Sequence, residues 1–330
     1  MLPKVSIIIP VYKAQDFLKR ALNSCIHQSL KEIEILIIDD CGGDNSLHIA
    51  KTFATNDRRI TIIENPKNLG TFHTRKRGIT QASSQYCMFL DPDDYLHTNA
   101  CEIAYKAIVK HNVDVVHFGM SYMPKTFKRI KPIVHKGRLE GERMRYFLSA
   151  RNNTQSLCDK IYKRQHLLQA LSMLSFMPPP LNMLEDGLLV LVASFESQSY
   201  FGINQDLYYY YTNIHSITKD KSIARFAQKQ SHLDKLLSVT SHLRTLYPAH
   251  AKLIEKYQHK IASTLMIESR DFSSFELYSS LQLLHKHGFN KTCDFSPYLK
   301  STILSLCYAF RWQNCVRGLI FICSFGLVRL

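Results

Sequence analysis

Two features that mark disulfide-stapled and zinc-binding proteins are missing from this sequence of 330 residues. Its nine cysteines are scattered from Cys25 to Cys323 and form no C-x-x-C pair. This spacing argues against a disulfide framework and a zinc ribbon, and it fits a reducing compartment. The N-terminus also lacks an apolar segment followed by a small-residue cleavage site, so we expect a cytoplasmic protein.

The C-terminal segment has no stretch long enough to cross a bilayer. Its longest uncharged run, 318–328, has 11 residues, whereas a spanning helix needs about 20. Two interpretations remain open: a helix that docks on the protein core, or a basic helix that lies in the headgroup region of an anionic membrane leaflet. The second interpretation rests on the aromatic residues Phe310, Trp312, Phe321 and Phe325 among Arg311, Arg317 and Arg329.

A glycine-rich turn is absent after the first strand-like run, which ends in Pro10, Val11 and Tyr12. Such a turn cradles the pyrophosphate of NAD in dinucleotide-binding enzymes, so its absence argues against hydride transfer. A nucleotidyltransferase that forms nucleotide sugars would also show a glycine-rich phosphate loop here. That enzyme class remains an alternative.

The sequence has few acidic residues relative to its basic ones. Lys and Arg number 42 against 27 Asp and Glu, and the last third, 219–330, holds 16 of the basic residues against seven acidic ones. This excess predicts an anionic partner such as a membrane surface, a phosphorylated substrate or nucleic acid, or it forms a solvated face. A basic nucleic-acid-binding protein is therefore a second alternative. We expect no nucleic-acid partner, because acidic residues gather at the strand ends.

Strand-like and helix-like segments alternate through the first 120 residues. This alternation predicts an α/β fold with a mostly parallel sheet that carries helices on both faces. The predicted strands are 5–11, 33–39, 59–64, 86–90 and 113–118, and the predicted helices are 17–26, 46–54, 71–82 and 99–111. We expect one domain over 1–218, with 121–218 as its second half, and a mainly helical region over 219–330.

Carboxylates follow two of the predicted strands. Asp39 and Asp40 end the second strand, and Asp91, Asp93 and Asp94 follow the fourth. In an open parallel sheet, ligands bind at the carboxyl ends of the strands. Clustered carboxylates repel one another unless a cation lies among them, and Mg²⁺ or Mn²⁺ prefers such oxygen ligands. The alternative is a solvated Asp-Pro turn.

Four motifs in this order resemble the signature of family-2 glycosyltransferases with the GT-A fold. They are Val5–Tyr12, Ile37–Asp40, Asn68–Gly70 with Arg75 and Gly78, and Phe89–Asp94. The resemblance covers residues 4–120 and extends more loosely to about residue 220, through Lys160, Glu185, Asp186 and the aromatic run from Tyr208.

The resemblance implies a role for each motif residue on the donor side. Pro10, Val11 and Tyr12 would flank the nucleotide base, and Asp39 would accept a hydrogen bond from a uracil-type imide. Arg75 would reach the base or the diphosphate, unless it is a plain surface residue of its helix. The acidic motif supplies the remaining roles: Asp91 and Asp93 for the nucleotide sugar, and Asp93 and Asp94 for the metal.

On the acceptor side, the resemblance implies that Asp186 is the catalytic base. An acidic residue that begins a helix can also serve only to compensate the helix dipole, so that interpretation stays open. Glu185, Lys160 and His215 are predicted as further contacts to the acceptor.

Taken together, the sequence predicts an inverting glycosyltransferase that depends on Mn²⁺ or Mg²⁺. The expected donor is a UDP-sugar carrying a hexose or N-acetylhexosamine. The expected acceptor is a glycan or a lipid-linked oligosaccharide in the synthesis of a bacterial surface glycan such as lipopolysaccharide. The basic C-terminal region would attract the protein to the inner face of the cytoplasmic membrane.

Overall fold

The computed structural model describes residues 2–124, 131–150, 155–212, 222–270, 272–291, 297–308, 310 and 312–323. The chain divides into two compact units, 1–216 and 217–330. Each unit has its own core and is described by itself.

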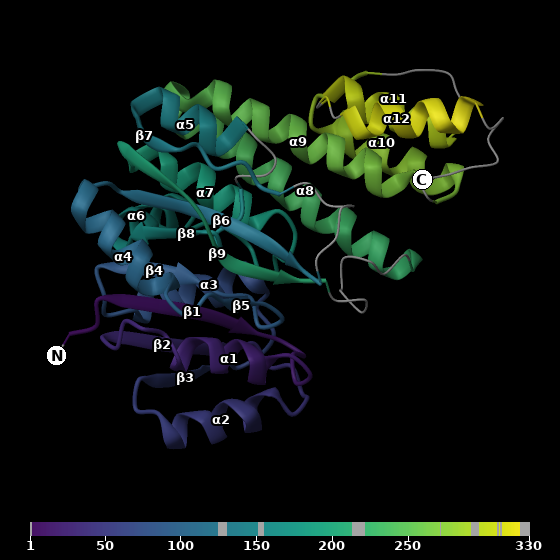
Figure 1. Cartoon of the computed structure of the whole chain (residues 1–330). Coiled ribbons are helices and arrows are strands. Elements are labelled where there is room, and N and C mark those ends of the chain that lie inside the picture. The colour runs from purple at the N-terminus through teal and green to yellow at the C-terminus, as the bar shows by residue number, and fades with distance from the viewer. Residues whose placement is uncertain are drawn as a thin grey trace. The chain divides into compact units, whose positions relative to one another are not determined.

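The first 123 residues of unit 1 confirm the predicted alternation of strands and helices (Figure 1). The elements are β1 (Val5–Val11), α1 (Leu18–Ile26), β2 (Ile33–Asp39), α2 (Ser46–Asn56), β3 (Ile60–Glu64), α3 (Thr71–Gln81), β4 (Tyr86–Phe89), β5 (Tyr95–Leu96), α4 (Ala100–His111) and β6 (Val115–Met123). Strand β1 is buried at all seven positions, as expected for a central strand covered on both faces.

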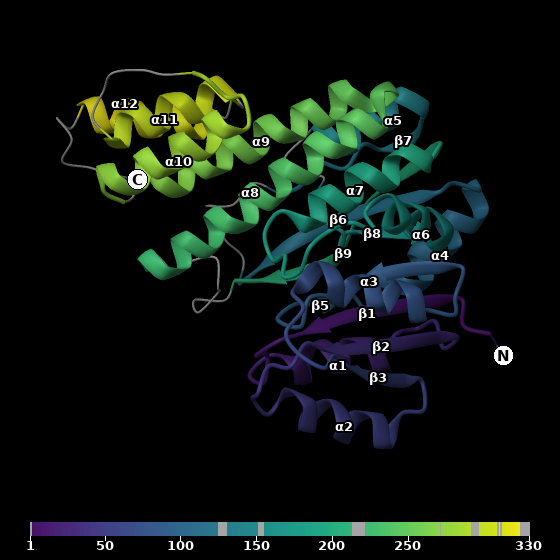
Figure 2. The same cartoon turned by 180° about the vertical axis from the view of Figure 1, so that it is seen from behind.

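The order of the first strands explains where a ligand can bind. Strands β3, β2, β1 and β4 lie side by side in that order and pair in parallel. The chain therefore adds β2 and β3 on one side of β1, and it then crosses back over the sheet to add β4 on the other side of β1. Because such crossovers are right-handed, α3 covers the face opposite to α1 (Figures 1 and 2). The reversal between β1 and β4 opens a crevice at the carboxyl ends of these strands.

The second half of unit 1 adds strands to the same sheet. Its elements are β7 (Gly137–Glu140), α5 (Gly141–Ala150), β8 (Lys160–Lys163), α6 (Arg164–Met173), α7 (Glu185–Glu196) and β9 (Ser199–Tyr211). Strand β8 lies antiparallel between β4 and β6, and β9 pairs with β5, β6 and β7. The aromatic run from Tyr208 is thus the end of a long strand. Its pairing with β5 places it beside the acidic turn after β4.

Helix α3 approaches the sheet unusually closely through Gly78. A Cβ atom at this position would lie 2.5 Å from Cγ2 of Ile8 and 2.9 Å from Cδ1 of Ile38. Both isoleucines are fully buried, so they have little room to move. Gly78 therefore sets the height of α3, and with it that of Arg75, above the sheet.

Unit 2 is helical in its described residues. It consists of α8 (Ile223–Leu246), a 3₁₀ turn (Pro248–His250), α9 (Ala251–Ser269), α10 (Ser274–Lys286), α11 (Pro297–Tyr308) and α12 (Trp312–Cys323). Leucines of α8, including Leu233 and Leu237, are fully buried, as are Ile261 and Leu265 of α9. None of the described helices combines the length and apolar character that crossing a membrane requires.

We predict opposite stability effects for the same substitution at two helical glycines. Gly78→Ala should lower the free energy of unfolding by about 1–2 kcal/mol, because overpacking against Ile8 and Ile38 outweighs the better helix propensity of alanine. Gly318→Ala in α12, where the nearest atom would be Cγ2 of Thr302 at 3.6 Å, should raise it by up to about 1 kcal/mol. Denaturant unfolding followed by circular dichroism measures both, and equal effects would contradict the close approach.

Candidate active site

The carboxyl ends of β1, β2 and β4 bring the predicted donor-side residues to one edge of the sheet. Asp39 ends β2 opposite Val11 of β1. Its Oδ2 accepts a hydrogen bond from the backbone N–H of Cys41 at 3.2 Å, and among the described residues its Oδ1 accepts none. Burial, with repulsion from Glu64, raises the pKa of Asp39. Its Oδ1 is thus a free acceptor near the half-buried Tyr12.

Asp40 fixes the turn that leads into α3. Its Oδ1 accepts hydrogen bonds from Nδ2 of Asn65 and from the N–H of Leu69, both at 2.8 Å, and its Oδ2 accepts one from the N–H of Gly70 at 2.9 Å. Gly70 has a φ of +82°, and a Cβ there would lie 2.7 Å from the backbone nitrogen of Leu181. The start of α3 is therefore held from two sides.

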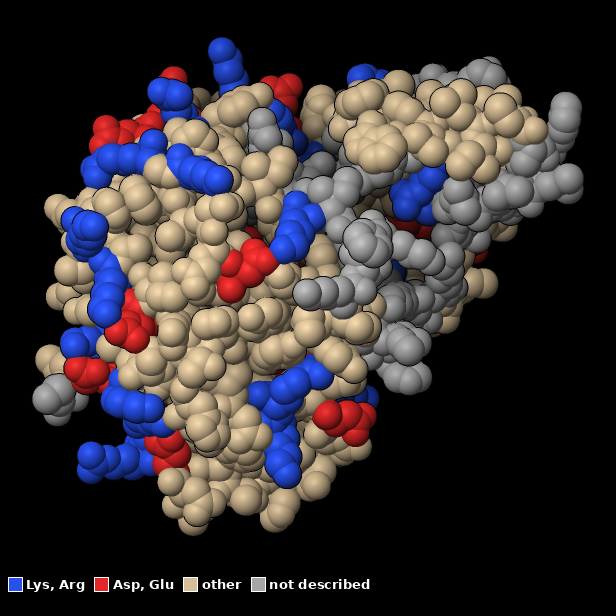
Figure 3. Space-filling model, viewed as in Figure 1, with Lys and Arg blue, Asp and Glu red and all other residues tan. Residues whose placement is uncertain are grey.

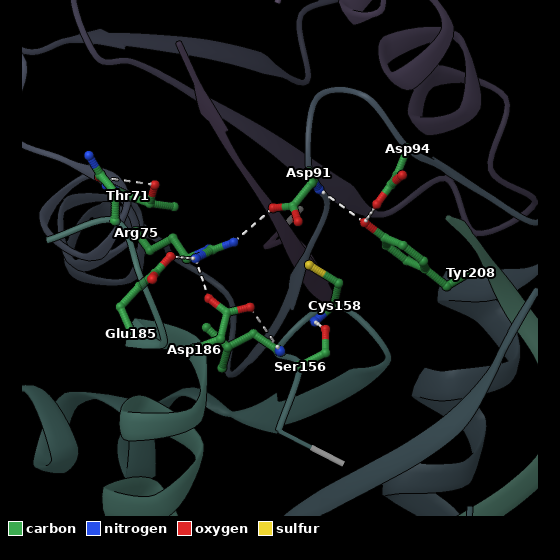
Figure 4. Close-up of polar contacts among 11 residues, drawn as sticks. Thr71, Arg75, Asp91, Asp94, Ser156, Cys158, Glu185, Asp186 and Tyr208 are labelled. Atoms are coloured by element: carbon green, nitrogen blue, oxygen red, sulfur yellow. Dashed lines mark hydrogen bonds and ion pairs between the residues drawn. The ribbon is translucent and has the colours of Figure 1, made fainter. Parts of the chain in front are cut away.

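Arg75 is the centre of the site (Figure 4). Its side chain is only 3% exposed, which excludes the interpretation that it is a plain surface residue. Its Nη2 lies 2.8 Å from Oδ1 of Asp91, and its Nη1 lies 3.1 Å from Oε1 of Glu185 and contacts Oδ1 of Asp186. One guanidinium thus joins the acidic turn after β4 to the first turn of α7.

Three carboxylates surround the single cation Arg75, and this excess of negative charge affects the pKa values of the carboxyl groups. Burial, reinforced by repulsion from Asp186, raises the pKa of Glu185 from an ordinary 4.5 to about 7. Burial also raises the pKa of Asp186, although Arg75 opposes the shift. Burial by itself would lower the pKa of Arg75, but attraction to Asp186 and Asp91 outweighs it and holds that pKa above its usual value. Arg75 therefore stays cationic, and the carboxylate of Asp186 beside it has a higher proton affinity than that of an ordinary aspartate.

Both carboxylate oxygens of Asp94 already accept hydrogen bonds, although the motif predicts this residue as a metal ligand. It is 1% exposed, its Oδ2 accepts a hydrogen bond from the hydroxyl of Tyr208 at 2.6 Å, and its Oδ1 accepts one from the N–H of Tyr211 at 2.7 Å. Burial raises its pKa well above the ordinary value. Because both oxygens are committed to β9, Asp94 anchors the acidic turn to that strand.

Asp93 is the carboxylate of this turn that fits a divalent cation. Its side chain accepts no hydrogen bond from any other described residue, and burial, with repulsion from Asp91, raises its pKa to about 6. Its backbone carbonyl accepts a hydrogen bond from Arg20, whose guanidinium lies 3.7 Å from the ring centre of Tyr211. A half-buried carboxylate to which no other residue donates a hydrogen bond is the kind of ligand that a hard cation stabilises.

Within the described part of the chain, no group of three or more His, Cys, Asp or Glu side chains forms a metal-binding cluster. Mg²⁺ and Mn²⁺ sites in phosphate-binding proteins need no such cluster. They use one or two carboxylates and complete their shells with waters and substrate phosphates. Asp93 with its neighbour Asp91 meets this requirement.

Lys160 does not face an acceptor. Its side chain is fully buried, and its Nζ donates to Oδ1 of Asp159 and, at 2.7 Å, to the carbonyl of Ser156. A buried ammonium with these partners supports the turn at Ser156, and from that turn the N–H of Leu157 points to Oδ2 of Asp186 at 3.5 Å. The predicted acceptor contact is therefore corrected to a supporting role. His215 lies outside the described residues.

Three supporting residues, Asp40, Asn182 and Tyr208, were given no role by the sequence motifs. Asp40 directly follows the motif residue Asp39, which was a usable signal. Asn182 accepts hydrogen bonds from the N–H and hydroxyl of Thr71, and Tyr208 joins Asp94 to the backbone N–H of Asp91 (Figure 4). Both act across more than 100 residues of sequence, and no local pattern marks such pairs.

The shifted pKa of Glu185 predicts a pH-dependent stability. Protonated Glu185 favours the folded state, so its contribution is complete below about pH 4.5 and is lost as the pH rises through about 7. Glu185→Gln cannot ionise. It should therefore gain about 1–3 kcal/mol relative to the unmodified protein between pH 5 and pH 8. Denaturant titrations at both pH values test this, with the exposed Glu142→Gln as the control that should show no such gain.

Comparison with known proteins places this site in a family. The chain matches glycosyltransferase GlyA of Streptococcus pneumoniae with 37% identity over 112 residues, which are 34% of this chain and 16% of GlyA. The chain thus spans less than a fifth of that relative. Its fold matches Staphylococcus aureus TarS 1–349 in complex with UDP-GlcNAc, with a TM-score of 0.63 and 18% identity over 99% of this chain and 93% of TarS 1–349.

A second solved structure shares the fold. It is the mannosyltransferase PcManGT from Pyrobaculum calidifontis in complex with GDP-Man and Mn²⁺, with a TM-score of 0.51 and 13% identity over 97% of this chain and 88% of that one. The profile of glycosyl transferase family 2 matches residues 6–170, which include most of β1, the acidic turn and Arg75. The chain therefore belongs to glycosyl transferase family 2 and has the GT-A fold.

Proposed function

We propose that this chain is an inverting, metal-dependent glycosyltransferase that moves a hexose or N-acetylhexosamine from a UDP-sugar to a sugar acceptor. The observation that carries the proposal is the Arg75 cluster. It joins Asp91, from the predicted donor side, to Glu185 and Asp186, from the predicted acceptor side, through one buried guanidinium. A group transfer needs its donor and its base at such a junction.

The donor would bind at the carboxyl ends of β1 and β2. The ring of Tyr12 offers a face to the base, with Pro10 and Val11 beside it. The free Oδ1 of Asp39 can only accept a hydrogen bond, so it favours a base that presents an N–H, as uracil does. The fold shared with TarS, which was solved with UDP-GlcNAc, supports a UDP-sugar.

Asp93, with Asp91 beside it, would hold Mn²⁺ or Mg²⁺. The bound cation would neutralise the charge that develops on the departing nucleoside diphosphate. The PcManGT complex with GDP-Man and Mn²⁺ supports this cofactor class. Asp94 contributes by anchoring the turn to Tyr208 and Tyr211.

Asp186 would act as the base. The acceptor hydroxyl oxygen attacks the anomeric carbon from the face opposite the diphosphate. As the new C–O bond forms, the bond from that carbon to the phosphate oxygen breaks, UDP leaves with its electron pair, and Asp186 takes the hydroxyl proton. The raised pKa of Asp186 makes it a stronger base than an exposed aspartate, while Arg75 holds the carboxylate in place.

The proposed acceptor is a sugar of a bacterial surface glycan such as lipopolysaccharide, free or linked to a lipid. The net positive charge of 219–330 supports an acceptor carried at an anionic leaflet. Glu185 remains a proposed acceptor contact, because its pKa near 7 lets it donate or accept a hydrogen bond.

We predict that Asp186→Asn lowers the rate of sugar transfer by about 10²–10⁴-fold, because asparagine keeps the contact to Arg75 and cannot take the proton. The affinity for UDP should stay unchanged, since Asp186 does not contact the nucleotide in this proposal. Rates are measured by UDP release in the presence of acceptor. The matched control is Asp57→Asn, which alters an aspartate at the opposite edge of the sheet and should leave the rate unchanged.

The first experiment is a panel of UDP-, GDP- and CMP-sugars incubated with the protein and either Mn²⁺ or EDTA. We expect slow release of free nucleotide from one UDP-sugar and none with EDTA. In calorimetry, Asp93→Ala should abolish the metal-dependent part of UDP binding. If the unmodified protein binds no UDP in the presence of Mn²⁺ or Mg²⁺, the proposed function is wrong.

A further inference from the structure

Helix α12 packs against its neighbour with its polar side. Asn314 is 1% exposed and its Nδ2 donates to Oγ of Ser305 in α11 at 3.1 Å. Gly318, one turn further along, is also buried, beside Thr302 of α11. The contact between the two helices is thus made by small and polar residues, which is the reverse of an ordinary surface helix.

The part of α12 that does not contact α11 is apolar and exposed. Trp312 is 57% exposed, Leu319 60% and Ile322 55%, with Val316 between them. Residues three or four apart lie on the same side of a helix, so these four side chains form one stripe, here called the α12 stripe. A soluble protein rarely exposes a contiguous row of large apolar side chains without a partner.

The charge around the α12 stripe indicates which partner fits. Between residues 286 and 323, the described residues carry four basic side chains, Lys286, Lys291, Lys300 and Arg317, and no acidic one. In Figure 3 the surface over α11 and α12 is largely uncharged. An apolar stripe on a helix whose described neighbourhood in sequence is basic matches an anionic lipid leaflet, in which the acyl-chain boundary takes the apolar side chains and the headgroups take the cations.

We propose that the α12 stripe inserts into the headgroup region of an anionic membrane and holds the protein at that surface. Helix α12 has 12 residues, too few to span a bilayer, so it lies in the plane of the interface. A second copy of the chain fits less well, because it would bring two basic surfaces together. This proposal does not depend on the proposed transferase activity.

Trp312 is the only tryptophan of the chain, so its fluorescence reports on the α12 stripe directly. The full chain is mixed with vesicles of phosphatidylcholine alone, or of phosphatidylcholine and phosphatidylglycerol in equal parts. With the anionic vesicles we expect a blue shift of the emission, quenching by lipids brominated near the headgroup, and loss of the shift in high salt. Phosphatidylcholine alone should give little shift.

Two variants separate insertion from simple charge attraction. Leu319→Glu with Ile322→Glu should weaken vesicle binding by about tenfold or more, because apolar burial is lost and like charges face the headgroups. Both side chains are exposed, so the fold is retained. The control carries the same two charges at exposed apolar positions of unit 1, Val109→Glu with Ile133→Glu, and should bind vesicles far better than the α12 variant.

Three outcomes would overturn the proposal: an unchanged Trp312 emission with anionic vesicles, equal vesicle binding by both double variants, or a dimer that dissociates when the stripe is altered and does not bind vesicles. UDP affinity is measured on the same samples. Vesicle binding without UDP binding would refute the proposed function and leave this proposal standing, and the reverse result would refute this proposal alone.

Discussion

The ion cluster around Arg75 is the interaction on which the rest of the site depends. Three carboxylates from two distant segments meet a single guanidinium that is itself only 3% exposed. Removing the cation would leave buried negative charge without compensation, and such losses typically cost several kcal/mol. The cluster also leaves the site with surplus negative charge, although the proposed donor is itself an anion. A divalent cation at Asp93, as proposed, would offset the repulsion between this negative charge and the donor.

The surrounding structure serves to hold that guanidinium in place. Gly78 lets α3 approach β1 and β2 closely, and Asp40 ties the preceding turn to the end of β2. On the other side, Lys160 supports the turn whose Leu157 N–H points to Asp186. Apart from the local contact of Lys160 with Ser156, these contacts join segments that are far apart in sequence. The precision of the site therefore comes from buried polar contacts between elements and not from the strands alone.

The two units illustrate different ways of using apolar residues. In unit 1, continuous apolar runs such as β1 are buried between two layers of helices, and the polar residues of the candidate site lie just beyond the strand ends. In unit 2, α12 turns Asn314 and Gly318 inward and Leu319 outward. A buried leucine is expected in any protein core. A buried asparagine on a helix with exposed apolar side chains is not expected, and such an exposed apolar patch indicates a binding surface.

The alternation of strands and helices, the acidic turn after β4 and the family resemblance could be predicted from the amino-acid sequence, because hydrophobic periodicity and turn chemistry are local. The same local patterns put Asp39, Asp91 and Asp93 at strand ends. Three contacts needed the folded chain: Asp94 turns inward to Tyr208, Lys160 is buried beside Asp159, and Arg75 pairs with Glu185 and Asp186. The reason is physical: a side chain's partner is fixed by which distant segments pack together, and that depends on the whole core rather than on its neighbours in the chain.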